Sequence, residues 1–164
     1  MHRLALIADT HIRNGKPVLP DRCIEALTAA DLIVHAGDLV TPEALAALVA
    51  LGTPVVAVRG NVDVPGLELV LPETHILTLH GACIAVVHDA GPARGRLDRL
   101  RNRFPGSDAV VFGHSHVPEH ATADDGFQIF NPGSPTARRR EPRHTMGLAF
   151  IADGTVTFEL VTLD

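Results

Sequence analysis

Seven residues with metal-binding side chains each stand after a short apolar run of this 164-residue chain. They are Asp9, His11, Asp38, Asn61, His88, His114 and His116. Carboxylate, amide and imidazole groups without thiolates suit Mn, Fe, Zn, Co or Mg better than a structural zinc site. Their number suits two ions, each with three or four protein ligands and open positions for water and substrate. The sequence therefore predicts a two-metal site.

Two ions held by so few residues must share a ligand, and Asp38 is the natural bridge. It follows Gly37, which allows close approach of the backbone, and a bridging carboxylate holds two ions about 3.5–4 Å apart. A water shared by two cations loses a proton easily and becomes a nucleophile near neutral pH. The predicted chemistry is hydrolysis.

Each fragment of this set has a plainer interpretation when taken alone. An Asp-x-His triplet is common, an isolated Gly-Asp is usually a turn, and a single histidine such as His88 is more often packed in a core. His114 and His116, one residue apart after a β-branched run, form a stronger pair. All of these residues nevertheless occur in order, each after a predicted strand, and this combination favours the metal-site interpretation.

The elements that position these residues alternate in the first half of the chain. Residues 3–9, 31–38 and 54–61 are predicted strands, and residues 21–30 and 41–52 are predicted helices. In the second helix Thr41 can cap the first turn, and Pro42 suits that turn. This order indicates a parallel sheet with crossover helices, whose ligands bind at the carboxyl ends of the strands.

The second half indicates a mixed sheet. Residues 74–89 form a predicted hairpin that turns at His80-Gly81-Ala82, and residues 93–104 form an arginine-rich amphipathic helix. Further strands are expected at 108–113, 127–131, 146–153 and 155–163. Two sheets packed face to face with helices outside would bury all of these runs, within one domain spanning residues 1–164.

Composition narrows the function classes. The chain is 46% hydrophobic with no Trp or Tyr, so we expect an aliphatic core. A formal net charge of −5 gives no general attraction to nucleic acid or to an anionic membrane, and no apolar run is long enough to span a bilayer. Cys23 and Cys83 are expected to be small buried residues. We expect a cytoplasmic protein with a small-molecule substrate. The exposed strands of the last hairpin could pair between two copies of the chain, so a homo-oligomer is a further possibility.

Five motifs resemble those of the calcineurin-like metallophosphoesterases. They are Asp9-Thr10-His11, Gly37-Asp38, Gly60-Asn61-Val62-Asp63, Val87-His88 and Gly113-His114-Ser115-His116, and the likeness extends to Asn131–Ser134. The resemblance covers essentially the whole chain. It is greatest to the small bacterial and archaeal phosphodiesterase subgroup, which also contains the retromer scaffold subunit. It implies an α/β fold, a four-layer α/β/β/α sandwich of two mixed sheets with flanking helices.

The resemblance also implies a role for each matching residue. The first ion would take Asp9, His11, Asp38 and His116, and the second would take Asp38, Asn61, His88 and His114. The implied catalytic set is Asp38, Asn61, His88 and Asp63. The implied activity is a phosphodiesterase that uses a metal-bridging hydroxide for in-line attack on phosphorus. Two divalent ions are implied, manganese first, with Ni, Co, Fe, Zn and Mg as alternatives.

Two positions depart from the family pattern. Many members carry His where this chain has Val62, which leaves the general acid unassigned. Asp89 stands where the family usually has Gly, either as a carboxylate that orients a ligand or a water, or as a solvated loop residue. A phosphomonoesterase, a non-catalytic metal-binding scaffold and a nuclease are the alternative functions. Small size, acidic balance and the lack of a basic stripe with aromatics argue against the nuclease.

A few other residues have two interpretations. Arg59 and the run Arg138–Arg140 can contact a phosphate or a partner, or simply be solvated and ion-paired. Asn131 and Ser134 are expected to hold the loop of His114 and His116 by backbone hydrogen bonds. His35 is expected to point to the opposite sheet face and to be structural.

Overall fold

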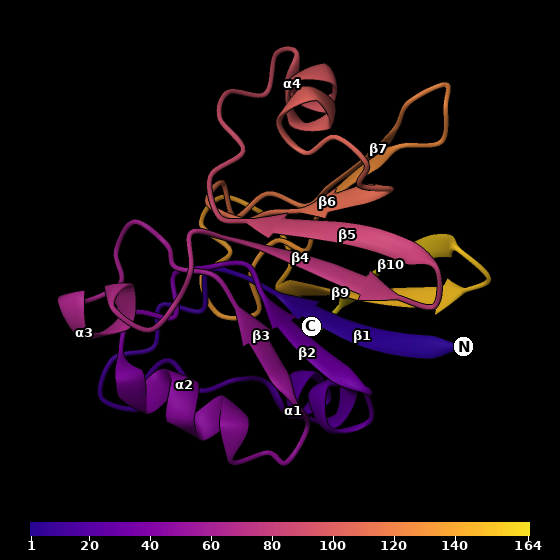
Figure 1. Ribbon diagram of the computed structural model, residues 1–164. Helices are drawn as coiled ribbons and strands as arrows, with labels where there is room; N and C mark the ends of the chain where they lie inside the picture. Colours follow the sequence, from indigo (N-terminus) through magenta and orange to yellow (C-terminus); the bar gives the residue numbers. More distant parts are fainter.

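The computed structural model describes residues 1–164, whose strands form two five-stranded sheets (Figure 1). The first sheet has the order β10-β9-β1-β2-β3. Its strands are β1 (His2–Ile7), β2 (Leu32–His35), β3 (Val55–Ala57), β9 (Thr145–Ala152) and β10 (Thr155–Thr162). β1, β2 and β3 are parallel, and β9 runs antiparallel to both β1 and β10. The C-terminal hairpin thus completes the sheet begun by the N-terminal strand.

The second sheet has the order β4-β5-β6-β8-β7. Its strands are β4 (Thr74–Leu79), β5 (Ala82–Val87), β6 (Ala109–Val111), β7 (Glu119–Thr122) and β8 (Gln128–Asn131). β5, β6 and β8 are parallel, while β4 and β7 form antiparallel edges. The predicted hairpin is confirmed, because His80 and Gly81 both have positive φ, as a tight two-residue turn requires.

The helices are short. They are α1 (Asp21–Thr28), α2 (Pro42–Val49), α3 (Pro65–Glu68) and α4 (Arg96–Arg103). The Thr41 hydroxyl accepts a hydrogen bond from the Ala44 amide at 3.2 Å, so the predicted cap is confirmed. α4 begins later than predicted because Gly95, at φ 69°, adopts a left-handed conformation immediately before it. No helix has the length and hydrophobicity needed to cross a membrane.

Two elements were not predicted from the sequence. α3 is a single turn that begins at Pro65, and β7 is an edge strand whose residues alternate between half-buried and exposed. Neither carries an apolar periodicity long enough to detect. Cys23 is buried as predicted, whereas Cys83 is only half-buried, with its thiol 3.7 Å from the Ser107 hydroxyl. The expectation of a buried Cys83 is therefore wrong, since β5 leaves that side chain facing a surface loop.

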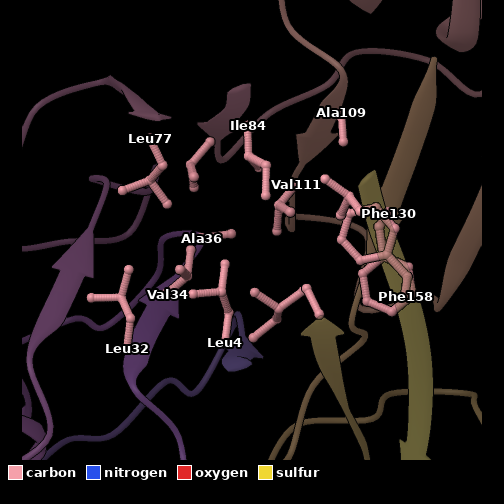
Figure 2. Packing of buried hydrophobic residues seen from close by; sticks show 14 of the residues in the cluster. Leu4, Leu32, Val34, Ala36, Leu77, Ile84, Ala109, Val111, Phe130 and Phe158 are labelled. Carbon is pink, nitrogen blue, oxygen red and sulfur yellow. The ribbon is translucent and has the colours of Figure 1, made fainter. Parts of the chain in front are cut away.

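Three apolar layers confirm the four-layer sandwich. The inner layer lies between the sheets, and Figure 2 shows Leu4 and Val34 of one sheet facing Ile84 and Val111 of the other. At one end of this layer the rings of Phe130 and Phe158 stack with centroids 4.6 Å apart. The two outer layers contain α1 and α2 against the first sheet and α4 against the second (Figure 1).

This topology brings five strand ends together. β1, β2 and β3 run in one direction within the first sheet, as do β5 and β6 within the second. The loops that follow these strands carry all seven predicted metal ligands. The carboxyl ends of parallel strands are where α/β sheets bind their ligands, so the fold gathers the predicted ligand residues where a site is expected.

Candidate metal centre

Three buried polar atoms lack any hydrogen-bond partner and point at one another. They are Asp9 Oδ1, His11 Nε2 and His116 Nε2. Asp9 Oδ1 lies 3.9 Å from His11 Nε2 and 3.6 Å from His116 Nε2. Leaving a buried polar atom unpaired costs about 1–3 kcal/mol each, so such a convergence requires a compensating group. A divalent cation bound by one carboxylate and two imidazoles would satisfy all three atoms.

Hydrogen bonds on the far side of two rings fix which nitrogen can bind an ion. His116 Nδ1 donates to the carbonyl of Ala137, and His88 Nδ1 donates to the carbonyl of Ala36 at 2.8 Å. In the neutral ring the proton is therefore on Nδ1, and Nε2 presents its lone pair to the cluster. This is the arrangement by which proteins orient a metal-binding histidine.

A second group of acceptor atoms forms around Asn61. Asn61 Oδ1 lies 3.0 Å from His88 Nε2 and 3.0 Å from His114 Nδ1. His88 Nε2 also lies 3.4 Å from Asp38 Oδ2. With the His88 proton committed to Ala36, an amide oxygen, a carboxylate oxygen and an imidazole nitrogen face one another with lone pairs. A cation, or an additional proton on His88, relieves that repulsion.

Asp38 lies between the two groups. Its Oδ2 is 3.3 Å from His11 Nε2 on one side and 3.4 Å from His88 Nε2 on the other. Its Oδ1 accepts a hydrogen bond of 3.0 Å from the Val62 amide, which fixes the plane of the carboxylate. The structure thus brings all seven predicted ligand residues together, with Asp38 in the position that a bridging ligand would need.

The backbone reaches this arrangement through an uncommon conformation. Asp9, His11, Asp38, His114 and His116 all have φ between 48° and 72°. Non-glycine residues avoid this left-handed region, and such strain persists only where surrounding contacts determine the conformation. The turn after each strand aims the side chain back over the end of the sheet, which an extended residue could not do.

Glycines leave room for the ligands. A Cβ on Gly37 would lie 2.5 Å from His88 Nδ1, and one on Gly113 would lie 2.8 Å from the Ala8 side chain. A Cβ on Gly60 would overlap both the carboxylate and the amide nitrogen of Asp38. The glycine that precedes each of these motifs is therefore required by close packing.

Burial and charge shift the pKa values in opposite directions within this cluster. Burial raises the pKa of Asp9 to about 7, even though nearby histidines lower it. Burial also acts to raise the pKa of Asp38, but the neighbouring His11 and His88 rings, together with the hydrogen bond from the Val62 amide, outweigh it and hold that pKa well below its usual range. Burial lowers the pKa of His116 to about 4. A neutral His116 and an ionised Asp38 are the forms that bind cations.

Asp63, predicted as a catalytic residue, lies behind the cluster. Its Oδ1 accepts from the Val40 amide at 2.7 Å, and its Oδ2 accepts from the Gly60 amide at 2.6 Å. The side chain is buried and both of its oxygens are engaged by the backbone. The geometry supports a positioning role, in which Asp63 joins the loop after Asp38 to the loop that carries Asn61.

The predicted role is confirmed for Asn131, whereas Ser134 bonds to a different loop from the one predicted. Asn131 Nδ2 donates to the Gly113 carbonyl at 3.0 Å and to the Ser115 hydroxyl at 3.1 Å, so it holds the loop of His114 and His116. Ser134 acts one loop away, because its hydroxyl donates to the Asp9 carbonyl at 2.8 Å.

Two supporting threonines were missed by the sequence reasoning. Thr136 Oγ1 donates to the Thr10 carbonyl at 2.7 Å, and the Thr10 hydroxyl lies 3.0 Å from His35 Nε2. The expected structural character of His35 is confirmed by its complete burial. Only the placement of Thr10 between Asp9 and His11 could have drawn attention to it, since Thr136 has no signal in the sequence.

The remaining candidates lie at the rim. Asp89 is exposed and its Oδ1 accepts from the Gly91 amide at 2.7 Å, which favours the loop interpretation. Arg138 donates to the Glu141 carbonyl within its own loop, and Arg139 and Arg140 are exposed. Val62 offers no proton, but its amide holds Asp38. None of the three arginines contacts the ligand cluster through a hydrogen bond.

Fold and cluster together define the class of α/β-sandwich metallohydrolases. The chain belongs to the calcineurin-like phosphoesterase superfamily, whose domain matches residues 2–154. A probable metallophosphoesterase of Methanocaldococcus jannaschii is 36% identical over 151 residues, which cover 89% of this chain and 74% of that relative.

Solved structures show the same fold. A Thermotoga maritima protein superposes with a TM-score of 0.77 at 29% identity, covering 99% of this chain and 100% of that one. Vps29 of Entamoeba histolytica gives 0.77 at 23% identity over 99% of each chain. An archaeal phosphodiesterase gives 0.75 at 17% identity over 97% of this chain and 99% of that one. The last two likenesses concern the fold alone.

Proposed function

We propose that this protein is a dinuclear metal-dependent phosphoesterase that acts on phosphodiesters. The observation that carries the proposal is the convergence of the unpaired atoms Asp9 Oδ1, His11 Nε2 and His116 Nε2 beside Asp38. The chain's membership of a metallophosphoesterase family supports the same reaction class. A small phosphate ester in the cytoplasm is the proposed substrate.

The residues divide between two ions. Asp9, His11, Asp38 and His116 would hold the first ion, and Asp38, Asn61, His88 and His114 would hold the second. Asp38 Oδ2 faces the histidines of both groups, which supports the bridging assignment. The oxygen and imidazole donors suit manganese, while Ni, Co, Fe, Zn and Mg remain alternatives for the experiment to rank.

Bound at these residues, two divalent cations would supply a water of lowered pKa and stabilise negative charge on the phosphoryl oxygens. The protein's own part is to fix the ligands. Ala36 and Ala137 carbonyls keep the protons of His88 and His116 on the side away from the cluster. The Val62 amide orients Asp38, and Asp63 keeps the two ligand loops together as a positioning residue.

The preference for diesters has support from charge, whereas the missing acid bears on the leaving group. A diester carries one negative charge fewer than a monoester, which suits a site already lined by Asp9 and Asp38. Position 62 is Val, so no side chain there can protonate a leaving group, and a leaving group of low pKa such as nitrophenolate needs no protonation. The archaeal phosphodiesterase shows that the same fold carries diester hydrolysis elsewhere.

The decisive experiment compares two chromogenic esters on one protein sample. The protein is stripped with chelator and reloaded with Mn²⁺, Ni²⁺, Co²⁺, Zn²⁺ or Mg²⁺, and bound metal is counted by elemental analysis. We expect about two ions per chain and hydrolysis of bis(p-nitrophenyl) phosphate faster than of p-nitrophenyl phosphate. Preference for the monoester would overturn the diester assignment and retain the reaction class.

The alternative function is a non-catalytic metal-binding scaffold, favoured by the fold-level likeness to Vps29. It predicts two bound ions without turnover of either ester. Both functions use the same ligand residues and predict bound metal, so turnover in the diester assay is the measurement that separates them.

A further inference from the structure

A pocket of about 290 Å³ opens beside the proposed second ion. It is lined by Gly60, Asn61 and His88 together with Arg59, Glu73 and Arg103. Asn61 and His88 are proposed metal ligands, so a substrate held there by its phosphoryl group would extend an ester arm toward the two arginines. The pocket therefore contacts both the ligand cluster and positively charged side chains.

The two arginines share one carboxylate. Arg59 Nη2 lies 3.6 Å from Glu73 Oε2, and Arg103 Nη2 lies 3.4 Å from Glu73 Oε1. Arg59 comes from the loop after β3, Arg103 from the last turn of α4, and Glu73 from the residue before β4. Three separate segments thus place one carboxylate between two guanidinium groups. This is the geometry of an anion-binding site in which a side chain of the protein takes the place of the anion.

Glu73 is a replaceable occupant of this position. Its side chain is 65% exposed, and both ion pairs are longer than a well-formed charged hydrogen bond. Exposed pairs of this kind contribute little to stability, so an incoming anion can displace Glu73 at little cost. Asp89, the other acid of the pocket, is already held by the Gly91 amide.

We infer that Arg59 and Arg103 select phosphate esters whose organic arm carries a second anionic group, a carboxylate or a phosphate, and that Glu73 occupies this subsite until the substrate arrives. The inference rests on the proposed function, since it extends the same site. It names a substrate class: esters with two anionic groups separated by a short organic arm.

The test uses two ligands that differ only at the far end of the arm. Propyl phosphate ends in a methyl group, and 2-carboxyethyl phosphate ends in a carboxylate at the same place. Both are titrated by calorimetry into the metal-loaded protein, so that the measurement does not depend on turnover. We expect the carboxylate ligand to bind about tenfold more tightly to the wild-type protein.

Three variants separate an anion subsite from an ordinary surface ion-pair network. Arg59→Gln and Arg103→Gln should each abolish the preference for the carboxylate ligand. Glu73→Gln should increase it by about threefold or more, because it removes the competing anion. A purely structural network predicts that Glu73→Gln behaves like the arginine variants. Arg101→Gln, on the same helix but paired with Asp125 outside the pocket, is the matched control and should retain the wild-type preference.

Equal affinities of the two ligands in the wild-type protein and in Glu73→Gln would overturn the subsite. The binding experiment tests the subsite independently of the proposed activity. A carboxylate preference without hydrolysis of any diester would retain the subsite and reject the enzyme, whereas diester hydrolysis without the preference would do the reverse.

Discussion

The Thr10 hydroxyl and His35 Nε2 lie 3.0 Å apart in the interior, directly beneath the ligand cluster. His35 Nδ1 accepts a hydrogen bond of 3.2 Å from the Gly37 amide, so the ring proton must be on Nε2 and is donated to Thr10. Thr10 stands between two proposed ligands of the first ion, and Gly37 precedes the proposed bridge. One neutral imidazole therefore couples the loop after β1 to the loop after β2.

Removing that ring should destabilise the protein. His35→Leu leaves the buried Gly37 amide without an acceptor, at a cost of about 1–3 kcal/mol in the free energy of unfolding. His35→Asn places an oxygen near the position of Nδ1, so this variant should lose less stability than His35→Leu. Urea unfolding of the two variants and the wild type measures the difference. Equal stability of His35→Leu and wild type would contradict the coupling.

The burial of His35 also predicts that the free energy of unfolding depends on pH. Burial, with further contributions from nearby charges, lowers the pKa of His35 from 6.5 to about 3. Between these values the unfolded chain binds a proton that the folded chain excludes. Stability attributable to His35 is therefore full above pH 6.5 and declines as the pH falls, by at most about 1.4 kcal/mol per pH unit.

The raised pKa of Asp9 acts in the opposite sense, because the folded protein binds the extra proton between about pH 4 and 7. The measurement is consequently a difference between two proteins. Metal-free wild type and His35→Asn are unfolded in urea from pH 7 to pH 4, and the wild type should lose stability more steeply. Parallel curves would mean that His35 does not titrate in this way.

Gly60→Ala should disrupt the cluster. The added methyl group would overlap the Asp38 carboxylate and amide, so the loop of Asn61 must move away from the proposed bridge. We expect metal affinity to fall about tenfold to a hundredfold, as measured by calorimetric titration of Mn²⁺. Gly66→Ala is the control, because its Cβ would meet nothing closer than the Pro42 ring at 3.7 Å. Wild-type affinity in Gly60→Ala would refute the close-packing argument.

Asp38→Asn should reduce both metal content and activity. The amide keeps the shape of the side chain but removes the charge that would hold two cations, so we expect a loss of one ion and a fall in kcat of about a hundredfold or more. Elemental analysis and the diester assay measure the two effects. Asp124→Asn, in an exposed turn, is the charge-matched control. A fully active Asp38→Asn protein would exclude the bridge.

Asp63→Ala distinguishes positioning from direct catalysis. It leaves the Val40 and Gly60 amides unpaired, so we expect a stability loss of about 1–3 kcal/mol together with weaker metal binding. Activity should recover substantially at saturating metal. A variant with normal stability and metal affinity but a collapsed kcat would instead place Asp63 among the catalytic residues, as the family resemblance implies.

Much of the fold followed from local pattern. The apolar runs, the Thr41 cap and the His80-Gly81 turn are signals carried by a few neighbouring residues, and the structure confirms the elements that they predict. β7 and α3 lacked such signals, because an edge strand and a single turn are stabilised by the elements beside them.

The kinds of candidate ligand and their order could be predicted from the sequence, because side-chain chemistry and strand periodicity are properties of short segments. Which atoms meet depends instead on how distant segments pack. Strained φ values aim the ligands, and carbonyls far along the chain fix the protons of His88 and His116. The roles of Asp63 and His35, and the pairing of Arg59 and Arg103 through Glu73, likewise depend on contacts between distant segments. Such contacts exist only once packing has fixed the loops, so no local pattern encodes them.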